Sequence, residues 1–191
     1  SKEKNKDISV CILEKGSEIG SHILSGAVIE TKSLSELIPN WKETDIPLKT
    51  KAKKDSFLYL TKEKSYKLPT PPQMNNHGNF IISLGKLCSW LGQYAENLGV
   101  EIYPGFAASE ILFNSDGSVS GVATNDMGIL KDGTKGPNYE PGIELLAKQT
   151  IFSEGCRGHL GKILMDKFDL NKNNQGQTYA IGIKELWEID P

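Results

Sequence analysis

Residues 8–26, ISVCILEKGSEIGSHILSG, constrain the fold of this chain more than any other stretch. They begin with an apolar run rich in β-branched residues, which is typical of a strand buried on both faces. The run ends at Glu14, and Gly16 and Gly20 follow it. In a dinucleotide-binding βαβ unit, the second strand ends in an acid that accepts hydrogen bonds from both ribose hydroxyls. The pattern therefore predicts either such a carboxylate or a buried strand with an exposed acid at its end.

The residues around Glu14 bear on the interpretation as part of a dinucleotide-binding unit. The Gly-rich phosphate turn of such a unit lies about 20 residues before the acid. Only 13 residues precede Glu14, so we expect the chain to begin inside the nucleotide-binding unit. Lys15 is either a solvated side chain or one that steers the adenosine. Ser25, Gly26 and Ala27 follow the next loop, and they form either an ordinary turn or a close backbone approach to a ligand.

Composition limits the classes of protein to consider. The 191 residues are enough for one domain or one and a half, and the net charge of −2 argues against a general nucleic-acid binder. No run of about 18 apolar residues predicts a membrane-spanning helix. The polar start SKEKNKD resembles neither a signal peptide nor a transit peptide. The cysteines are three and far apart, which favours free thiols in a reducing compartment: Cys11, Cys88 and Cys156.

A second strand-to-helix turn lies late in the chain, at Glu154, Gly155, Cys156, Arg157 and Gly158. Glycines at a helix N-terminus allow a polar ligand to approach its exposed N–H groups. Arg157 either contacts a phosphate or is exposed to solvent. Cys156 has no acid–base partner nearby in the sequence, so we assign it no catalytic role. The histidines show no spacing typical of a metal site or a catalytic triad: His22, His77 and His159.

A short apolar helix is predicted after Ser33, which forms a capping box with Glu36. Pro39 ends it, and an aromatic residue follows. Either this is a surface helix packed on its own domain, or it is an interfacial segment whose apolar side chains enter a lipid surface. The side chains concerned are Leu34, Leu37, Ile38 and Trp41.

The remaining pattern predicts a layered α/β chain. Residues 49–67 combine two lysine-rich pieces with the apolar run 57–60, which favours a hairpin or edge strands with solvated lysines. An amphipathic helix begins after Ser83 and stops at Gly99. Residues 125–142 are predicted to be a polar loop. Further strands are predicted at 100–103, 109–113, 118–124, 143–147, 150–152 and 178–187, and a helix after Gly158.

Three blocks of sequence carry a resemblance to a known family. They are EKGSEIGSHILSGAVIE (14–30), MNNHGNFIISLGKLCSWLGQYAENLGVEIYPGFAASEILF (74–113) and TIFSEGCRGHLGKILMDKFDL (150–170). Together they resemble the electron-transfer flavoprotein–ubiquinone oxidoreductases, which are membrane-attached FAD and iron–sulfur enzymes. The resemblance runs from about residue 8 to residue 190, and the chain is similar to an interior portion of those longer proteins.

The resemblance implies a fold and a set of site residues. The fold is a glutathione-reductase-type FAD-binding domain formed by 8–45 and 80–168, lacking its first strand and Gly-rich loop. Residues 46–79 and 171–191 would form part of a β-rich, quinone-side domain, and an iron–sulfur domain is expected beyond residue 191. The implied FAD contacts are Glu14, Lys15, Ser25, Gly26, Ala27, Ala108, Glu154 and Gly155. The family also assigns 23–44 to the membrane surface, which favours the interfacial interpretation of Leu34, Leu37, Ile38 and Trp41.

The function implied by the resemblance is electron transfer from reduced electron-transfer flavoprotein to ubiquinone. FAD and a 4Fe-4S cluster with ligands outside this chain would be the cofactors, and no side chain acts as a catalytic nucleophile. The partners would be electron-transfer flavoprotein, ubiquinone and a membrane surface, but not nucleic acid. The implied location is the matrix face of the mitochondrial inner membrane or the cytoplasmic face of a bacterial one. The alternatives are an NAD(P)H-dependent flavin hydroxylase or prenyl reductase of the same fold, and a non-catalytic fragment.

Overall fold

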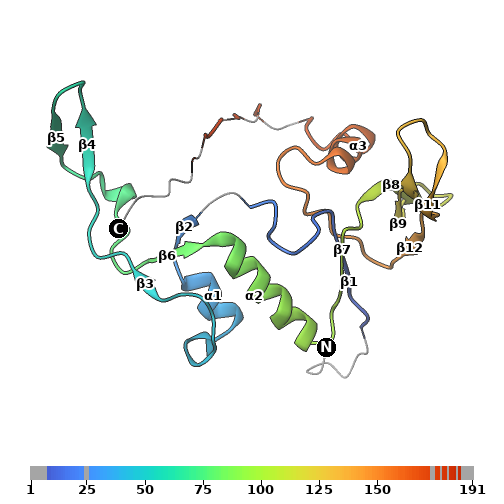
Figure 1. Ribbon diagram of the computed structural model, residues 1–191, viewed down its shortest axis with the longest axis horizontal. Helices are drawn as coiled ribbons and strands as arrows, with labels where there is room; N and C mark the ends of the chain where they lie inside the picture. Colours follow the sequence, from blue (N-terminus) through green and yellow to red (C-terminus); the bar gives the residue numbers. More distant parts are fainter. Residues whose placement is uncertain are drawn as a thin grey trace. The chain divides into compact units, whose positions relative to one another are not determined.

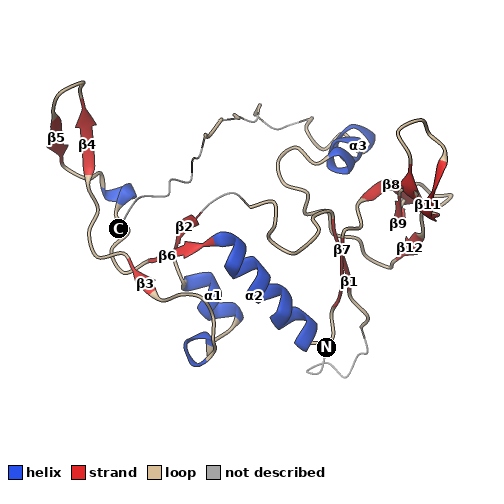
Figure 2. Ribbon diagram, in the orientation of Figure 1, coloured by secondary structure: helices blue, strands red, loops and turns tan. Residues whose placement is uncertain are grey.

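The computed structural model is a mixed α/β structure with several small sheets, which confirms the predicted α/β class (Figures 1 and 2). The residues that it describes are 8–23, 26–172, 175–176, 178–179, 181–183 and 185. The chain divides into two compact units, described separately below. Unit 1 comprises Ser1–Ile12 and Gly16–Ile102, and unit 2 comprises Leu13–Lys15 and Tyr103–Pro191.

Unit 1 is built on a three-stranded antiparallel sheet in the order β2–β6–β3. Its strands are β2 (Gly26–Ile29), β6 (Phe80–Ser83) and β3 (Thr50–Lys51). β6 alternates buried and exposed residues, as expected of a strand with one face on a core. The helices of this unit are α1 (Lys32–Leu37), α2 (Leu84–Asn97) and the short 3-10 helices η2 (Trp41–Glu43) and η3 (Pro72–Met74).

A single hydrophobic cluster holds these elements together. Ile38 is 2% exposed and Trp41 is 4% exposed, and the ring of Trp41 meets Phe80 edge-on at 5.7 Å between ring centres. Leu87 brings α2 into the same cluster. Burying side chains of this size contributes roughly 1.5–3 kcal/mol each to folding. The buried members are Leu34, Ile38, Trp41, Ile46, Leu48, Phe80, Ile82 and Leu87.

The start of α2 was predicted correctly, whereas the start of α1 was not. α2 begins after Ser83, whose hydroxyl accepts the Lys86 N–H at 3.4 Å, and Gly99 follows it with φ +89°, as predicted. The predicted capping box of α1 is wrong, because the helix begins two residues earlier than it requires. Ser33 therefore lies inside α1, and the N-cap is Thr31, which makes no side-chain cap hydrogen bond.

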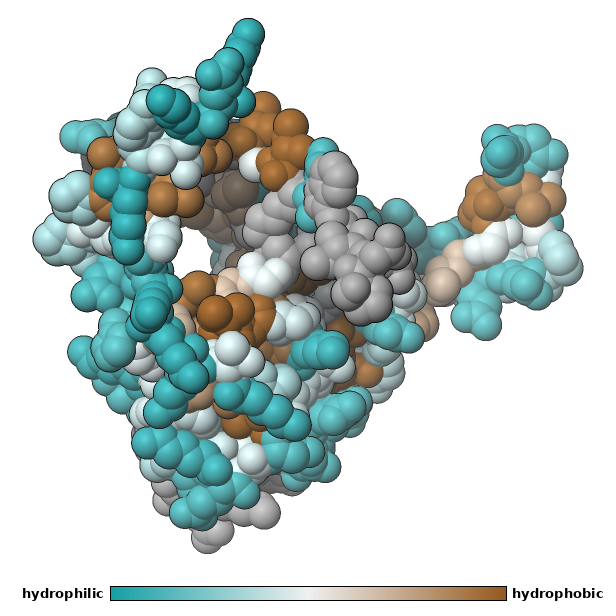
Figure 3. Space-filling view, turned by 60° about the vertical axis from the view of Figure 1, so that its left-hand side comes forward, coloured by the Kyte–Doolittle hydropathy of each residue, from teal (hydrophilic) through white to brown (hydrophobic). Residues whose placement is uncertain are grey.

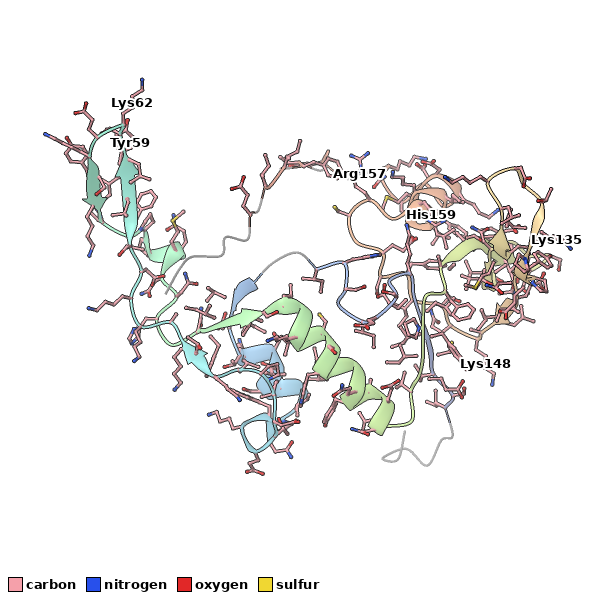
Figure 4. The ribbon with its side chains drawn as sticks, in the orientation of Figure 1. Tyr59, Lys62, Lys135, Lys148, Arg157 and His159 are labelled. Carbon is pink, nitrogen blue, oxygen red and sulfur yellow. The ribbon has the colours of Figure 1, made fainter. Side chains whose placement is uncertain are left out.

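The predicted lysine-rich hairpin is present as β4 (Phe57–Leu60) and β5 (Ser65–Leu68), paired antiparallel. Every residue of both strands is exposed. Tyr59, which Figure 4 labels on this hairpin together with Lys62, lies opposite Tyr66. Other large apolar side chains also reach the surface, and Figure 3 shows hydrophobic patches among hydrophilic residues.

Unit 2 contains a three-stranded antiparallel sheet in the order β12–β9–β8. The strands are β8 (Ala108–Phe113), β9 (Val119–Thr124) and β12 (Glu144–Leu146). The helix α3 (His159–Lys167) contacts β8, and the ring of Phe168 lies 6.4 Å from that of Phe113. Ile111 and Leu160 are the large side chains that this unit buries most deeply among the described residues.

Three predictions for unit 2 need correction. Residues 125–142 are not a plain loop, because they contain the hairpin of β10 (Met127–Ile129) and β11 (Lys135–Glu140). Asp132 stabilises its turn by accepting the N–H and the hydroxyl of Thr134. Residues 150–152 form no strand, since no neighbouring strand pairs with them. Of 178–187, the described residues form no strand, and residues 180, 184, 186 and 187 lie outside the described part of the chain.

The two compact units divide the chain at different places from the predicted domains. The unit boundaries fall near residues 12–16 and 102–103, whereas the predicted FAD-binding domain joins 8–45 with 80–168. The compact units are defined by contacts within the chain, whereas the predicted domains follow from the family resemblance. The predicted FAD-binding and quinone-side domains therefore stay a prediction.

Candidate nucleotide-binding site

The candidate site is built on the pairing of β1 (Cys11–Glu14) with β7 (Glu101–Pro104) (Figure 1). The Glu101 N–H donates to the carbonyl of Val10 at 3.0 Å, so the first residue of β7 lies beside the start of β1. If the two strands were antiparallel, this hydrogen bond would place the residues of β1 beside the segment that precedes β7, and Glu14 would lie beside the end of α2. The strands are therefore parallel, and their carboxyl ends lie together.

The neighbouring strand also affects the Cys11 thiol. Partial burial raises its pKa, and the negative charge of Glu101 raises that pKa further. A raised thiol pKa lowers the thiolate fraction at neutral pH, so Cys11 is a poor nucleophile.

Glu14 is the last residue of β1 and is half-buried. It lies at the carboxyl end of the parallel pair, which is where ligands bind in open α/β sheets. Lys15 follows it as an exposed residue. At the same end, β7 leads into a turn at Gly105, whose φ of +83° favours glycine. Ala108 begins β8 three residues later and is half-buried.

The structure gives Glu154 a capping contact at the start of α3. Its Oε2 accepts the backbone N–H of Gly161 at 2.7 Å, and its Oε1 accepts that of Leu160 at 3.5 Å. Oε1 also lies 3.5 Å from Nδ1 of His159, which Figure 4 labels at the start of α3. A carboxylate at this position satisfies unpaired N–H groups and complements the helix dipole. Its oxygens are therefore already engaged within the chain.

Two glycines make this contact possible. Gly155 has φ +75°, a conformation that residues with a side chain rarely adopt. A Cβ on Gly158, the N-cap of α3, would overlap the side chain of Glu154. Arg157, between them, places its guanidinium 5.2 Å from the ring centre of Tyr179. The turn thus orders the start of α3 through its glycines, a role that we did not predict.

The other predicted contacts lie in unit 1 or outside the described residues. Gly26 begins β2 opposite Ser83, and a Cβ there would meet the carbonyl oxygen of Ile82 at 2.7 Å. Close strand pairing therefore explains this glycine. Ala27 packs against the hydrophobic cluster. Ser25 lies outside the described residues.

The loop after Glu14 is held close to α2, a feature that was not predicted. Gly20 lies so close to α2 that a Cβ would come within 2.6 Å of the Gly85 carbonyl oxygen. A Cβ on Gly92 would overlap Ile19. Gly85 and Gly92 are seven residues apart, so they share one face of the helix. That spacing is the sequence signal that would have identified the close approach.

The chain was compared with known proteins. No model of a protein family matches the sequence. It is 56% identical over 191 residues to the mitochondrial electron transfer flavoprotein-ubiquinone oxidoreductase of Dictyostelium discoideum, covering 100% of this chain and 32% of that protein. It is 56% identical over 189 residues to the probable electron transfer flavoprotein-ubiquinone oxidoreductase of Acinetobacter baylyi, covering 97% of this chain and 33% of that protein. The mitochondrial protein of that name from Homo sapiens is 55% identical over 189 residues, 97% of this chain and 30% of its own length.

The chain belongs to the electron transfer flavoprotein–ubiquinone oxidoreductase family. This confirms the resemblance on which the sequence analysis relied. The chain spans about a third of the length of the curated relatives that it matches. Several of these relatives are named as mitochondrial.

Family membership does not by itself place a cofactor in these residues. In the part of the chain that the structure describes, no three histidine, cysteine or acidic side chains are grouped to hold a metal ion. The three cysteines are free thiols. For a nucleotide, the residues present are Glu14 at the end of β1 and, after the end of β7, the turn at Gly105 and the small Ala108.

The predicted membrane-surface residues of this family member have unequal exposure. Leu34, Ile38 and Trp41 are buried in the cluster of unit 1, which corrects the expectation that their side chains face outward. Leu37 is 75% exposed. Among the described residues, no helix is both long and apolar enough to span a bilayer. A membrane-surface role for 23–44 stays a prediction.

Proposed function

We propose that the protein containing this chain passes electrons from electron-transfer flavoprotein to ubiquinone, and that this chain supplies part of its FAD site. The observation that carries the proposal is the identity of 51–56% across 97–100% of the chain to proteins of that name. Identity at this level over almost every element supports a shared function better than fold alone.

The fold proposed for the complete protein includes a glutathione-reductase-type FAD-binding domain. Its support here is the parallel pair β1–β7, with Glu14 at the carboxyl end. Glu14 is proposed to accept hydrogen bonds from the ribose hydroxyls, because a carboxylate suits hydroxyls and repels phosphate. Ala108 is proposed to present its backbone to the adenine, since a small side chain leaves room for the base.

Further FAD contacts are proposed elsewhere in the chain. From the late turn we retain Gly155, because the Glu154 carboxylate is engaged by α3. A flavin, when bound, supplies the redox chemistry, and the protein sets its position and electrostatics. A 4Fe-4S cluster is proposed for the whole protein, with ligands outside this chain. The remaining proposed contacts are Lys15, Ser25, Gly26 and Ala27.

The proposed partners are electron-transfer flavoprotein, ubiquinone and the surface of a membrane. The names of the relatives supply electron-transfer flavoprotein and ubiquinone, and several of the relatives are named as mitochondrial. An NAD(P)H-dependent hydroxylase or prenyl reductase would instead take electrons from a nicotinamide. A fragment without activity would accept electrons from neither donor.

The test is the choice of electron donor. The purified full-length protein is mixed in a stopped-flow instrument with reduced electron-transfer flavoprotein, NADH or NADPH, and flavin absorbance is recorded. We expect bleaching by electron-transfer flavoprotein and negligible bleaching by either nicotinamide. Rapid bleaching by NADH or NADPH would support the hydroxylase class instead, and no bound flavin would contradict the proposed FAD site.

A further inference from the structure

The loop of residues 16–23 packs against one side of α2 in unit 1. Ile19 is half-buried, and its Cδ1 lies over Gly92, so that a Cβ on this glycine would overlap it. The next residue, Gly20, has its carbonyl oxygen 3.2 Å from the position that a Cβ on Gly85 would take. The loop therefore contacts α2 at two places that are about two helical turns apart.

The contact with Ile19 explains a glycine that the helix alone would not favour. Glycine is less favourable than alanine inside a helix, because it has more conformational freedom to lose. Gly92 nevertheless lies in the interior of α2, and it is buried. A side chain there would press on the loop, since the nearest atoms to an added Cβ are all in Ile19. The glycine therefore keeps space for the loop at some cost to the helix.

The opposite side of α2 is fixed by the hydrophobic core of unit 1. At about 100° of rotation per residue, Leu87 and Tyr94 lie on the side of the helix that faces away from Gly92. Leu87 is buried in the hydrophobic cluster, and Tyr94 packs against it. The indole N–H of Trp90 also donates to Oδ1 of Asp45 at 2.7 Å. The core therefore holds α2 in place, and the free side of the helix supports the loop.

Hydrogen bonds within the loop connect the contact at Ile19 to the backbone that follows it. The Ser21 N–H donates to the carbonyl of Glu18 at 3.2 Å, and the Ile23 N–H donates to that of Gly20 at 3.1 Å. Gly20 has φ +85°, which allows the chain to reverse there. These close turns make the segment compact, so a displacement of Ile19 would move the backbone on both sides of it.

We propose that Ile19 is a positioning residue for FAD, which holds the loop on α2 through its contact with Gly92. This inference rests on the proposed FAD site, because Lys15 precedes the loop in the chain and Gly26 and Ala27 follow it. A binding site needs its contacts held within about 0.5 Å of the productive geometry, and loops hold them less precisely than helices or strands. Ile19 acts through the loop and does not itself contact the cofactor.

The test moves one methyl group across the contact. Gly92→Ala adds a Cβ that overlaps Cδ1 of Ile19, whereas Ile19→Val removes that Cδ1 and leaves Cγ1 and Cγ2 at an ordinary 3.5 Å from the added Cβ. FAD affinity of the full-length apoprotein is measured by quenching of flavin fluorescence. We expect Gly92→Ala to bind FAD about tenfold more weakly, because the loop is displaced. The double variant Gly92→Ala/Ile19→Val should bind within about twofold of wild type, since contacting residues compensate each other.

Gln93→Ala is the matched control, because it changes an exposed neighbour on the same helix, and it should bind FAD as wild type does. Wild-type affinity in Gly92→Ala, or a loss that Ile19→Val does not restore, would overturn the inference. Ile19→Ala is a second variant that leaves the helix unaltered and removes the side chain from the loop. It should weaken FAD binding about threefold or more, because the loop loses its contact with α2. Unchanged affinity in Ile19→Ala would also overturn the inference.

A spectroscopic measurement separates positioning from stability. Visible circular dichroism of the bound flavin is recorded at saturating FAD, where every variant is fully occupied. We expect an altered flavin band in Gly92→Ala and the wild-type band in the double variant. A wild-type band in Gly92→Ala would show that only stability had changed and would overturn the positioning role. Wild-type protein that binds no flavin would contradict the proposed function itself, whereas failure of the Ile19 contact alone leaves the donor-choice test unaffected.

Discussion

The two units bury their apolar side chains to very different extents. Unit 1 gathers eight of them into one cluster around Trp41 and Ile38. In unit 2, Ile111 and Leu160 are the deeply buried members among the described residues, while Ile151 and Leu146 are 82% and 72% exposed. Unit 1 is therefore held by packing, whereas unit 2 depends more on strand ladders and turn hydrogen bonds. Regions with few buried apolar contacts open more readily, and binding sites are often found in them.

The largest expected effect tests the packing of unit 1. Trp41→Ala should lower the free energy of unfolding by about 3–5 kcal/mol, because it leaves a cavity in the cluster. Urea unfolding followed by circular dichroism measures this. Leu37→Ala is the matched control on α1, and it should change stability by less than about 0.5 kcal/mol because that side chain is exposed. Equal losses in the two variants would mean that the cluster is not the core of unit 1.

The corresponding change in unit 2 should be somewhat smaller. Leu160 is 1% exposed, so Leu160→Ala should lower the free energy of unfolding by about 2–5 kcal/mol. We expect a value near the low end of this range, because loosely packed neighbours can move into the cavity. Ile163→Ala, on the same helix but at a 46% exposed position, should cost much less. Differential unfolding monitored by hydrogen exchange distinguishes the units. A loss larger than that of Trp41→Ala would reverse the comparison.

The cap of α3 gives a smaller effect. Glu154→Ala should lower stability by about 0.5–2 kcal/mol, because two N–H groups lose their acceptor. Hydrogen exchange should speed up in the first turn of α3. Asp166→Ala, near the other end of the helix, should be neutral or slightly stabilising, since an acid there opposes the helix dipole. If Glu154→Ala weakens FAD binding strongly while exchange in α3 stays unchanged, the capping role is wrong.

The smallest effect is a pH dependence in the β10–β11 hairpin of unit 2. The Gly142 N–H and the Tyr139 hydroxyl lower the pKa of Asp126, and Thr134 does the same for Asp132. A lowered folded-state pKa means stability that is present above the unfolded pKa of about 3.9 and is lost as pH falls below it. Amide exchange or chemical shifts in β10–β11 should therefore change only below about pH 4. Asp126→Asn should remove its share of that change.

Much of unit 1 could be predicted because its signals are local. Ser83 and Gly99 bound α2 through capping and a left-handed conformation, and the apolar spacing between them gives the buried face. The capping box at Ser33 was wrong because the N-cap lies two residues earlier, at Thr31. Which side of α1 is buried depends on the cluster that its Leu34 joins, and distant members of that cluster such as Phe80 are not revealed by any local pattern.

Less of unit 2 and of the candidate site could be predicted. The hairpin of 127–140 has weakly apolar strands and a proline at 137, so only its Asp132–Gly133 turn gave a signal. Glu154 contacts an N–H seven residues later, which needs the backbone reversal at Gly155. Glu14 was predicted from the end of an apolar strand, and the parallel neighbour β7 could not be identified from that stretch alone.

The central claim is that the carboxyl end of β1 holds the ribose of FAD through Glu14. The most direct measurement is FAD affinity of the full-length apoprotein, titrated by quenching of flavin fluorescence, for wild type, Glu14→Gln and the loop control Glu18→Gln. A hydrogen bond to a charged group is worth roughly 1.5–3 kcal/mol, so Glu14→Gln should weaken binding about tenfold or more. Glu18→Gln should bind as wild type does. Unchanged FAD affinity in Glu14→Gln would contradict the account.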